Sequence, residues 1–402
     1  SRRSKMDKYS LSFQQEEMWI AEQFYSTGNL WNIGGYSKLD SNIDPQLLSK
    51  ASVLSLNSFS NFKARILVDK DGAPYQVFDE QVAFDYEYVD YLVDDESAIS
   101  WMQKKMVEPL LSNESKLIYV AIIKTTNALF YFFKIHHLLS DFFGVKIMAN
   151  MMMQIYAKLK DNQEILLQSL VGTDYRDYLV SQKAYLGSPT WLKEKEYWEK
   201  ELSLKETVFS LFPKIQNNQL KSKVEYMVVD YLKKEALVKL AKDNNVSVFV
   251  FWLYLIGTTF IRMNSLEFFY LGVHFLNRIN IKQKGNPGLF ANSLPIKIGN
   301  NEFKEELSVV SKRVKNAFRH QQFPIKKISL PTDFYSVVVS FESYQKEEDI
   351  YACTLKSDES ICPITFYIDN NKIQIVYHES IGMEKINEII ANLWETINRV
   401  IG

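Results

Sequence analysis

The chain has 402 residues, of which 47% are hydrophobic and 24% are charged. A single hydrophobic core stops growing at roughly 250–300 residues, so this length predicts two lobes. The 47 basic residues nearly cancel the 48 acidic residues, and this balance argues against nucleic acid and anionic membranes as partners.

Cysteine usage and the apolar segments limit the class of protein further. The two cysteines, Cys353 and Cys362, form no Cys-x-x-Cys pattern, and the sequence has no Cys/His cluster at metal-ligand spacing, so we expect no metal site and no disulfide framework. The most apolar run, residues 246–261, is shorter than the ~20 residues that span a bilayer, and it predicts a buried helix. No stretch typical of a signal peptide follows the N-terminus. We therefore expect a cytoplasmic protein.

The first half of the chain contains two strong secondary-structure patterns. Residues 12–24 repeat apolar side chains at helical spacing after a candidate N-cap, Ser12, and predict an amphipathic helix. Residues 118–124 and 128–135 are rich in β-branched and aromatic side chains. The polar residues 125–127 between them predict a β-hairpin.

A second helix follows this hairpin. Apolar positions recur at helical spacing over residues 145–159, and Asp141 is a candidate N-cap a few residues upstream. His136 and His137 are therefore expected on a loop between a strand and a helix.

The boundary between the predicted lobes lies in the middle of the chain. Residues 175–202 are polar and aromatic, and Gly187-Ser188-Pro189 interrupts them before a second helix. We expect an N-terminal lobe over residues 1–175 and a C-terminal lobe over residues 176–402.

The second half of the chain mixes helices and strands. Strands are predicted at residues 224–231, 268–273, 336–341, 364–368 and 373–377, with a turn at 369–371, and helices at 233–244 and 383–400.

The string from His136 to Asp141 offers the clearest chemistry. Histidine is the side chain best suited to accept and return a proton near neutral pH. Asp141, four residues after His137, is placed to brace the loop through a salt bridge or as an N-cap. The alternative is a pair of structural histidines at a strand end. His274, His320 and His378 have no such pattern, and we expect structural or surface roles for them.

The string HHLLSDFFG at residues 136–144 resembles the HHxxxDG motif of condensation domains of nonribosomal peptide synthetases, which are related to chloramphenicol acetyltransferase. Further motifs of that family have counterparts in the same order. They are SFQQEEMW at 12–19, NFKARILVDKDGAPYQ at 61–76, YRDY at 175–178, GLFANSLP at 288–295 and HQQFP at 320–324.

This resemblance implies an α/β fold with two chloramphenicol-acetyltransferase-like lobes, arranged as a V-shaped pseudo-dimer with a central channel. It implies that His137 is the catalytic residue, that His136 is structural, and that Asp141 pairs with Arg278. GLFANSLP corresponds to the family's latch or floor region. The residues expected at the channel and latch are Gly144, Asn292 and Ser293.

The resemblance also implies an activity, which is amide bond formation between an acyl or peptidyl thioester on a carrier protein and an amine acceptor, usually carrier-bound. Such acyltransferases serve nonribosomal peptide biosynthesis, including that of antibiotics and other secondary metabolites. We expect no intrinsic cofactor, because the phosphopantetheine arms of donor and acceptor peptidyl carrier domains deliver the substrates. Adjacent synthetase modules are the other expected partners, and the domain, excised or minimal, is expected to be monomeric.

The sequence departs from the family pattern at two places and leaves alternatives open. Phe142 stands where the family has glycine after the aspartate, and Lys63 replaces an arginine. A stand-alone amide or ester synthase with a soluble acceptor would carry the same motifs, as would an epimerisation domain. An inactive condensation-like domain that recruits another enzyme is a further alternative, against which the intact His137, Asp141 and Arg278 argue.

Overall fold

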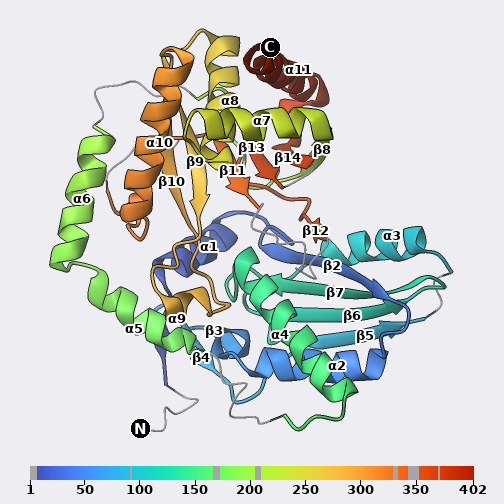
Figure 1. Ribbon diagram of the computed structural model, residues 1–402. Helices are drawn as coiled ribbons and strands as arrows, with labels where there is room; N and C mark the ends of the chain where they lie inside the picture. The colour runs from blue at the N-terminus through green and yellow to red at the C-terminus, as the bar shows by residue number, and fades with distance from the viewer. Residues whose placement is uncertain are drawn as a thin grey trace. The chain divides into compact units, whose positions relative to one another are not determined.

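The computed structural model describes residues 7–90, 93–165, 173–203, 210–328, 334–342, 353–369 and 372–402. It is a mixed α/β structure (Figure 1). Contacts along the chain divide it into two compact units. Unit 1 comprises Ser1–Ser188, Arg278–Ala291 and Glu347–Glu359, and unit 2 comprises Pro189–Asn277, Asn292–Lys346 and Ser360–Gly402.

Unit 1 is built on a five-stranded sheet in the order β12-β2-β7-β6-β5. The strands are β12 (Cys353–Leu355), β2 (Asn32–Asp40), β7 (Ala128–His136), β6 (Ile118–Lys124) and β5 (Asp85–Val89). β5 and β6 are parallel, and the other neighbours are antiparallel. Every residue of β7 is buried, because this central strand contributes alternate side chains to hydrophobic cores on both faces of the sheet.

Helices cover both faces of this sheet. Side chains of α2 (Pro45–Asn57) and α4 (Phe142–Lys160) share one core with Tyr131 and Phe133 of β7. Side chains of α3 (Asp95–Met106) share the other core with Phe130 and Phe132. The ends of β7 and α4 are therefore fixed by packing, and the loop between them carries His137.

The remaining elements of unit 1 lie around this sheet. A small antiparallel sheet has the order β1-β4-β3, and the string at residues 61–76 contributes most of its β3–β4 hairpin. These elements are β1 (Tyr9–Ser10), α1 (Phe13–Phe24), η1 (Ser60–Lys63), β3 (Ala64–Val68), β4 (Pro74–Phe78), α5 (Tyr175–Tyr185) and α9 (Ile281–Lys284).

Unit 2 is built on a six-stranded sheet in the order β10-β9-β11-β13-β14-β8. The strands are β10 (Asn292–Gly299), β9 (Phe268–Phe275), β11 (Val337–Phe341), β13 (Ile364–Ile368), β14 (Lys372–His378) and β8 (Ser222–Val228). Alternate residues of these strands, such as Ile373 and Ile375, face one large core. The helical elements are α6 (Pro189–Glu201), α7 (Tyr231–Asp243), α8 (Val248–Asn264), α10 (Phe303–Arg319), η3 (Ile325–Lys327), η4 (Glu379–Ile381) and α11 (Met383–Ile401).

The apolar run at residues 246–261 forms α8, and its burial confirms the predicted core helix. Along the described part of the chain, no single helix is long and apolar enough to cross a bilayer. α7 and α8 pass that test only as a pair, which is bent by 105°.

Most predicted elements are present, but their bounds differ in places. The strand predicted at 224–231 ends at Val228, because Asp230 caps α7 and Tyr231 begins that helix. The helix predicted from residue 145 begins at Phe142. Asn370 and Asn371 of the predicted turn lie outside the described residues.

The division into units differs from the single boundary predicted at residue 175. α5 belongs to unit 1, which extends to Ser188. Two later segments, Arg278–Ala291 and Glu347–Glu359, also belong to unit 1. The chain therefore passes more than once between the two units.

Candidate active site

The predicted histidine pair lies at the end of the central strand of unit 1. β7 ends at His136, α4 begins at Phe142, and residues 137–141 connect them. The backbone N–H of His137 donates to the carbonyl oxygen of Trp31 at 2.8 Å, and Leu139 N–H donates to the carbonyl of His136 at 3.0 Å. His137 is thus held on a short loop whose backbone is anchored to the start of β2.

The His137 imidazole is half-buried, and its Nδ1 is a buried atom without a hydrogen-bond partner among the described residues. The ring packs edge to face against Trp31, with 6.1 Å between ring centroids. Burial lowers the pKa of His137 below its ordinary value, and the nearby backbone and the Asp141 carboxylate oppose this only in part. The imidazole is therefore neutral at neutral pH and is able to accept a proton.

His136 lies next to His137 but is completely buried. Its Nε2 lies 2.7 Å from Glu22 Oε1, and its Nδ1 accepts the backbone N–H of Leu138 at 3.1 Å. Both ring nitrogens are occupied within the protein, which supports the expectation of a structural role.

Asp141 forms both contacts that its spacing predicts, an N-cap and a salt bridge. It is the N-cap of α4, where Oδ1 accepts the N–H of Gly144 at 2.9 Å. Its two oxygens also form a bidentate pair with Arg278, at 2.8 and 2.9 Å. The N–H groups of Phe290 and Ala291 donate to the same carboxylate, so this buried charge is fully hydrogen-bonded.

Arg278 in turn joins the segment that follows it to the start of α4. Its guanidinium donates to the carbonyl oxygens of Gln283, Asn286 and Gly288. It also lies over the Phe290 ring, 4.7 Å from the centroid. The structure therefore brings Asp141 and Arg278 together, and their support of catalysis remains a prediction.

Gly144 lies where two backbone segments of unit 1 approach closely. A Cβ atom at this position would stand 2.0 Å from the carbonyl oxygen of Pro287. Phe142 is the first residue of α4 and has a helical backbone that any L-residue adopts. The first turn of α4 thus requires glycine at 144, whereas position 142 accepts phenylalanine. The channel role expected for Gly144 stays a prediction.

Asn292 and Ser293 belong to unit 2. Asn292 begins β10, and its side-chain amide donates to the carbonyl oxygens of Gln321 and Phe323 at 2.7 and 2.9 Å. This links the GLFANSLP string to the HQQFP string. Ser293 lies opposite His274 of β9 in the sheet register. Their assignment to the latch also stays a prediction.

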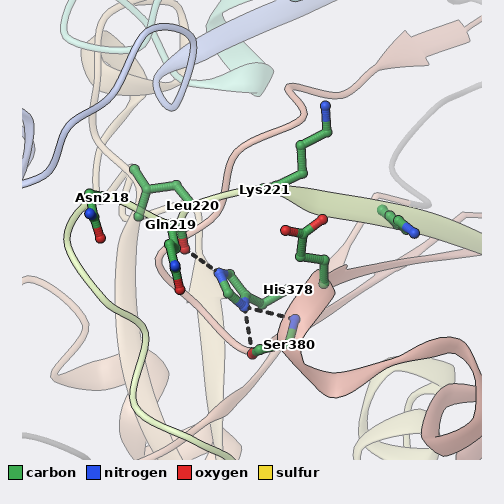
Figure 2. A pocket seen from close by; sticks show the side chains of 8 residues that line it. Asn218, Gln219, Leu220, Lys221, His378 and Ser380 are labelled. Atoms are coloured by element: carbon green, nitrogen blue, oxygen red, sulfur yellow. Dashed lines mark hydrogen bonds between the residues drawn. The ribbon is translucent and has the colours of Figure 1, made fainter.

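A surface pocket of about 530 Å³ lies in unit 2 (Figure 2). His378 lines it, but Nδ1 of this ring accepts the backbone N–H of Ser380 and Nε2 donates to the carbonyl oxygen of Gln219. Since both nitrogens are engaged, His378 is not poised to act as a base. The lining residues, Asn218, Gln219, Leu220, Lys221, Lys223, His378, Glu379 and Ser380, include none of the predicted site residues.

The other two histidines have structural or surface positions. His320 stacks on Tyr197 with 3.9 Å between ring centroids, and its Nδ1 bonds to the carbonyl oxygen of Asn316. His274 is exposed on β9. Within the described ranges, no group of three His, Cys, Asp or Glu residues could hold a metal ion.

Two residues at the site escaped the sequence analysis. Trp31 contacts the His137 ring, and Glu22 bonds the His136 ring. Trp31 lies in a polar connector without a periodic pattern. Glu22 lies on the predicted first helix, two turns after Gln15, and a glutamate in a partly apolar helix gives no sign of which distant side chain it meets.

Comparison with known proteins covers nearly the whole chain. The family model for the condensation domain matches residues 5–379. Surfactin synthase subunit 1 from Bacillus subtilis (strain 168) is 24% identical over 363 residues, which are 85% of this chain and 10% of the relative. Tyrocidine synthase 3 from Brevibacillus parabrevis is 21% identical over 328 residues, 80% of this chain and 5% of the relative. The chain thus spans a small part of the length of these relatives.

Solved condensation domains share the fold. The first condensation domain of the CDA synthetase has a TM-score of 0.84 and 15% identity, with 99% of this chain and 97% of that chain covered. The condensation domain of the Monacolin K polyketide synthase MokA has a TM-score of 0.84 and 14% identity, with coverages of 98% and 97%. These likenesses confirm the predicted α/β class. The match to the family model over residues 5–379 confirms the predicted enzyme class, because condensation domains are acyltransferases that form amide bonds. The match to the family model shows that this chain belongs to the condensation-domain family.

Proposed function

We propose that this chain joins an acyl or peptidyl thioester on a carrier protein to an amine acceptor through His137. The observation that carries the proposal is the loop at residues 137–141, on which a neutral, half-buried imidazole is held by the backbone of Trp31. The buried pair of Asp141 and Arg278 anchors the same loop at its other end.

The chemistry requires one proton acceptor near the new bond. The amine nitrogen attacks the thioester carbonyl carbon, a C–N bond forms, and the C–S bond breaks from the tetrahedral intermediate. His137 accepts the proton that the attacking nitrogen loses and returns it to the leaving thiolate. Because a thioester is already activated, alignment of the two reactants supplies much of the acceleration, about 7–11 kcal/mol in well-oriented systems.

The partners in this proposal are carrier domains and neighbouring synthetase modules. A dimodular nonribosomal peptide synthase from Bacillus subtilis (strain 168) is 22% identical over 79% of this chain. Condensation domains of such synthases work with the phosphopantetheine arms of carrier proteins. We assign both substrates of this chain to such arms, without a cofactor of its own, and place the reaction in the cytoplasm with the domain acting as a monomer.

Intact-mass analysis of two phosphopantetheinylated carrier proteins tests the proposal. One carrier is loaded with an acyl group and the other with an aminoacyl group. The unmutated chain should move the acyl mass to the acceptor carrier, and His137→Ala should slow this transfer by roughly 10²–10⁴-fold, the usual contribution of acid–base catalysis. His274→Ala, which changes an exposed histidine of β9, is the matched control and should retain activity.

Further arms of the experiment separate the alternatives. Transfer to a free amine or alcohol but not to the acceptor carrier would identify a stand-alone amide or ester synthase. Racemisation of the loaded aminoacyl group without transfer would identify an epimerisation domain. No transfer across a broad substrate panel, with carrier binding retained, would contradict the proposal and favour a recruiting domain.

A further inference from the structure

The carboxylate of Glu22 is buried on the side of α1 that meets the end of β7. Its side chain is 6% exposed, and Oε1 lies 2.7 Å from His136 Nε2. The backbone N–H of Ser112 donates to the same carboxylate at 3.1 Å, and the Ser112 hydroxyl donates to Oε2. Burial raises the pKa of Glu22, but the hydrogen bonds that its carboxylate accepts from His136 and Ser112 lower it by more, so that the pKa of this carboxyl falls below its ordinary value.

These contacts determine which nitrogen of His136 carries the proton. The backbone N–H of Leu138 donates to Nδ1, so Nδ1 has no hydrogen of its own. The proton of the neutral ring is therefore on Nε2, which donates it to Glu22. A ring protonated on both nitrogens would direct an N–H at the N–H of Leu138.

The orientation of His136 bears directly on His137. Leu138 follows His137 in the chain, so the bond from Leu138 N–H to His136 Nδ1 fixes the peptide group on the C-terminal side of His137. The bond from His137 N–H to Trp31 fixes the peptide group on its N-terminal side. The His137 backbone is consequently held from both directions, and Glu22 orients the ring that provides one of the two restraints.

A second residue of α1 contributes to the same turn. The side-chain amide of Gln15 donates to the carbonyl oxygen of Leu138 at 2.9 Å. Gln15 and Glu22 are seven positions apart, which places them about two helical turns apart on one face of α1. One helix face thus supports the turn that carries His137.

We propose that Glu22 is a positioning residue for the reaction at His137, which it serves by holding His136 in the Nε2–H tautomer that accepts the Leu138 N–H. This inference rests on the proposed function, in which His137 accepts the proton of the amine. Glu22 acts through His136 and does not touch substrate.

Steady-state kinetics of Glu22→Ala provide the first test. Displacement of the His137 turn should lower kcat for acyl transfer by roughly 10–100-fold, since small misplacements of a reacting group have effects of that size. KM for the acceptor carrier should stay unchanged. Glu16→Ala, which removes an exposed glutamate from the same helix, is the matched control and should leave kcat unchanged.

A double-mutant cycle tests whether Glu22 acts through His136. In His136→Asn, the shorter side chain offers an amide oxygen to the Leu138 N–H but no group that reaches Glu22. Glu22→Ala should therefore cause little further loss of kcat when it is added to His136→Asn. Losses that multiply independently would overturn the proposed route through His136.

Nuclear magnetic resonance gives a measurement that does not depend on activity. The ¹⁵N shifts of the His136 ring should report the Nε2–H tautomer in the unmutated chain. Glu22→Ala should change those shifts and the Leu138 amide resonance, whereas Glu16→Ala should not. An unchanged tautomer and an unchanged kcat in a folded Glu22→Ala protein would refute the inference.

If the unmutated chain transfers no acyl group, the proposed function fails. The His136 and Leu138 resonances still decide whether Glu22 positions the turn.

Discussion

Two adjacent histidines in this chain have opposite environments. Both ring nitrogens of His136 are hydrogen-bonded and the ring is inaccessible, whereas His137 is half-buried and its Nδ1 has no partner among the described residues. Sequence chemistry alone treats the two as equivalent bases. The partners that surround each ring support the assignment of proton transfer to His137.

The pH dependence of acyl transfer follows from the environment of His137. Burial lowers its pKa below the ordinary value of 6.5. Since the neutral imidazole is the active form, activity should persist as the pH falls and should be lost only below pH 6.5, as the ring becomes protonated. The pH profile of kcat/KM measures this acid limb. A limb centred above pH 6.5 would contradict the predicted direction of the shift.

The ion pair of Asp141 and Arg278 predicts a large effect on stability. Arg278→Ala would leave a buried carboxylate without its charged partner, and the free energy of unfolding should fall by about 3–5 kcal/mol. Arg399→Ala is the control, because Arg399 pairs with Glu395 on an exposed helix surface, where such pairs contribute about 0–1 kcal/mol. Urea unfolding measures both. Equal losses of unfolding free energy in the two variants would show that the buried pair contributes no more to stability than the exposed pair.

Among the elements, α4 depends on a close approach at its first turn. In Gly144→Ala, the new Cβ would stand 2.0 Å from the carbonyl oxygen of Pro287, so backbone must shift and the protein should lose stability and activity together. In Gly28→Ala, the new Cβ would meet ordinary contacts at 3.5 Å, and the effect should be small. Thermal unfolding of both variants tests this. An unfolding temperature unchanged in Gly144→Ala would contradict the close contact between the backbones at positions 144 and 287.

Local patterns predicted the elements that surround the site. The N-cap at Ser12, the hairpin of β6 and β7, and the N-cap at Asp141 all follow from short-range rules, and the structure adds that Gln15 completes a capping box with Ser12. Several elements were not predicted, among them α2, α3, β2 and α10. β2 contains Gly34 and Gly35, whose Cβ atoms would collide with neighbouring strands, so this strand is defined by its neighbours and not by its own propensity.

At the level of the whole molecule, the two units are interleaved in the chain. Unit 1 takes Arg278–Ala291 from a region that is otherwise part of unit 2. This segment supplies Arg278 and the N–H groups of Phe290 and Ala291, all of which bind Asp141.

A fragment of residues 1–188 should therefore fail to unfold cooperatively on its own, because the carboxylate of Asp141 would lack its partners. Addition of a peptide spanning residues 278–291 should raise the midpoint of unfolding, while a peptide with Arg278→Ala should not. Urea denaturation followed by tryptophan fluorescence measures this. Full cooperativity of the fragment alone would show that the later segment is dispensable for folding.

Periodicity and capping signals predicted mixed α and β elements with His137 on a loop between a strand and a helix, and the resemblance of short motifs implied the condensation-domain family. These properties follow from residues close together in the sequence, where propensity and capping act. The contacts of Glu22 with His136 and the return of Arg278–Ala291 to unit 1 emerged only in the folded chain. They join residues more than a hundred positions apart, and such distances depend on sheet order, register and packing, to which distant parts of the chain contribute together.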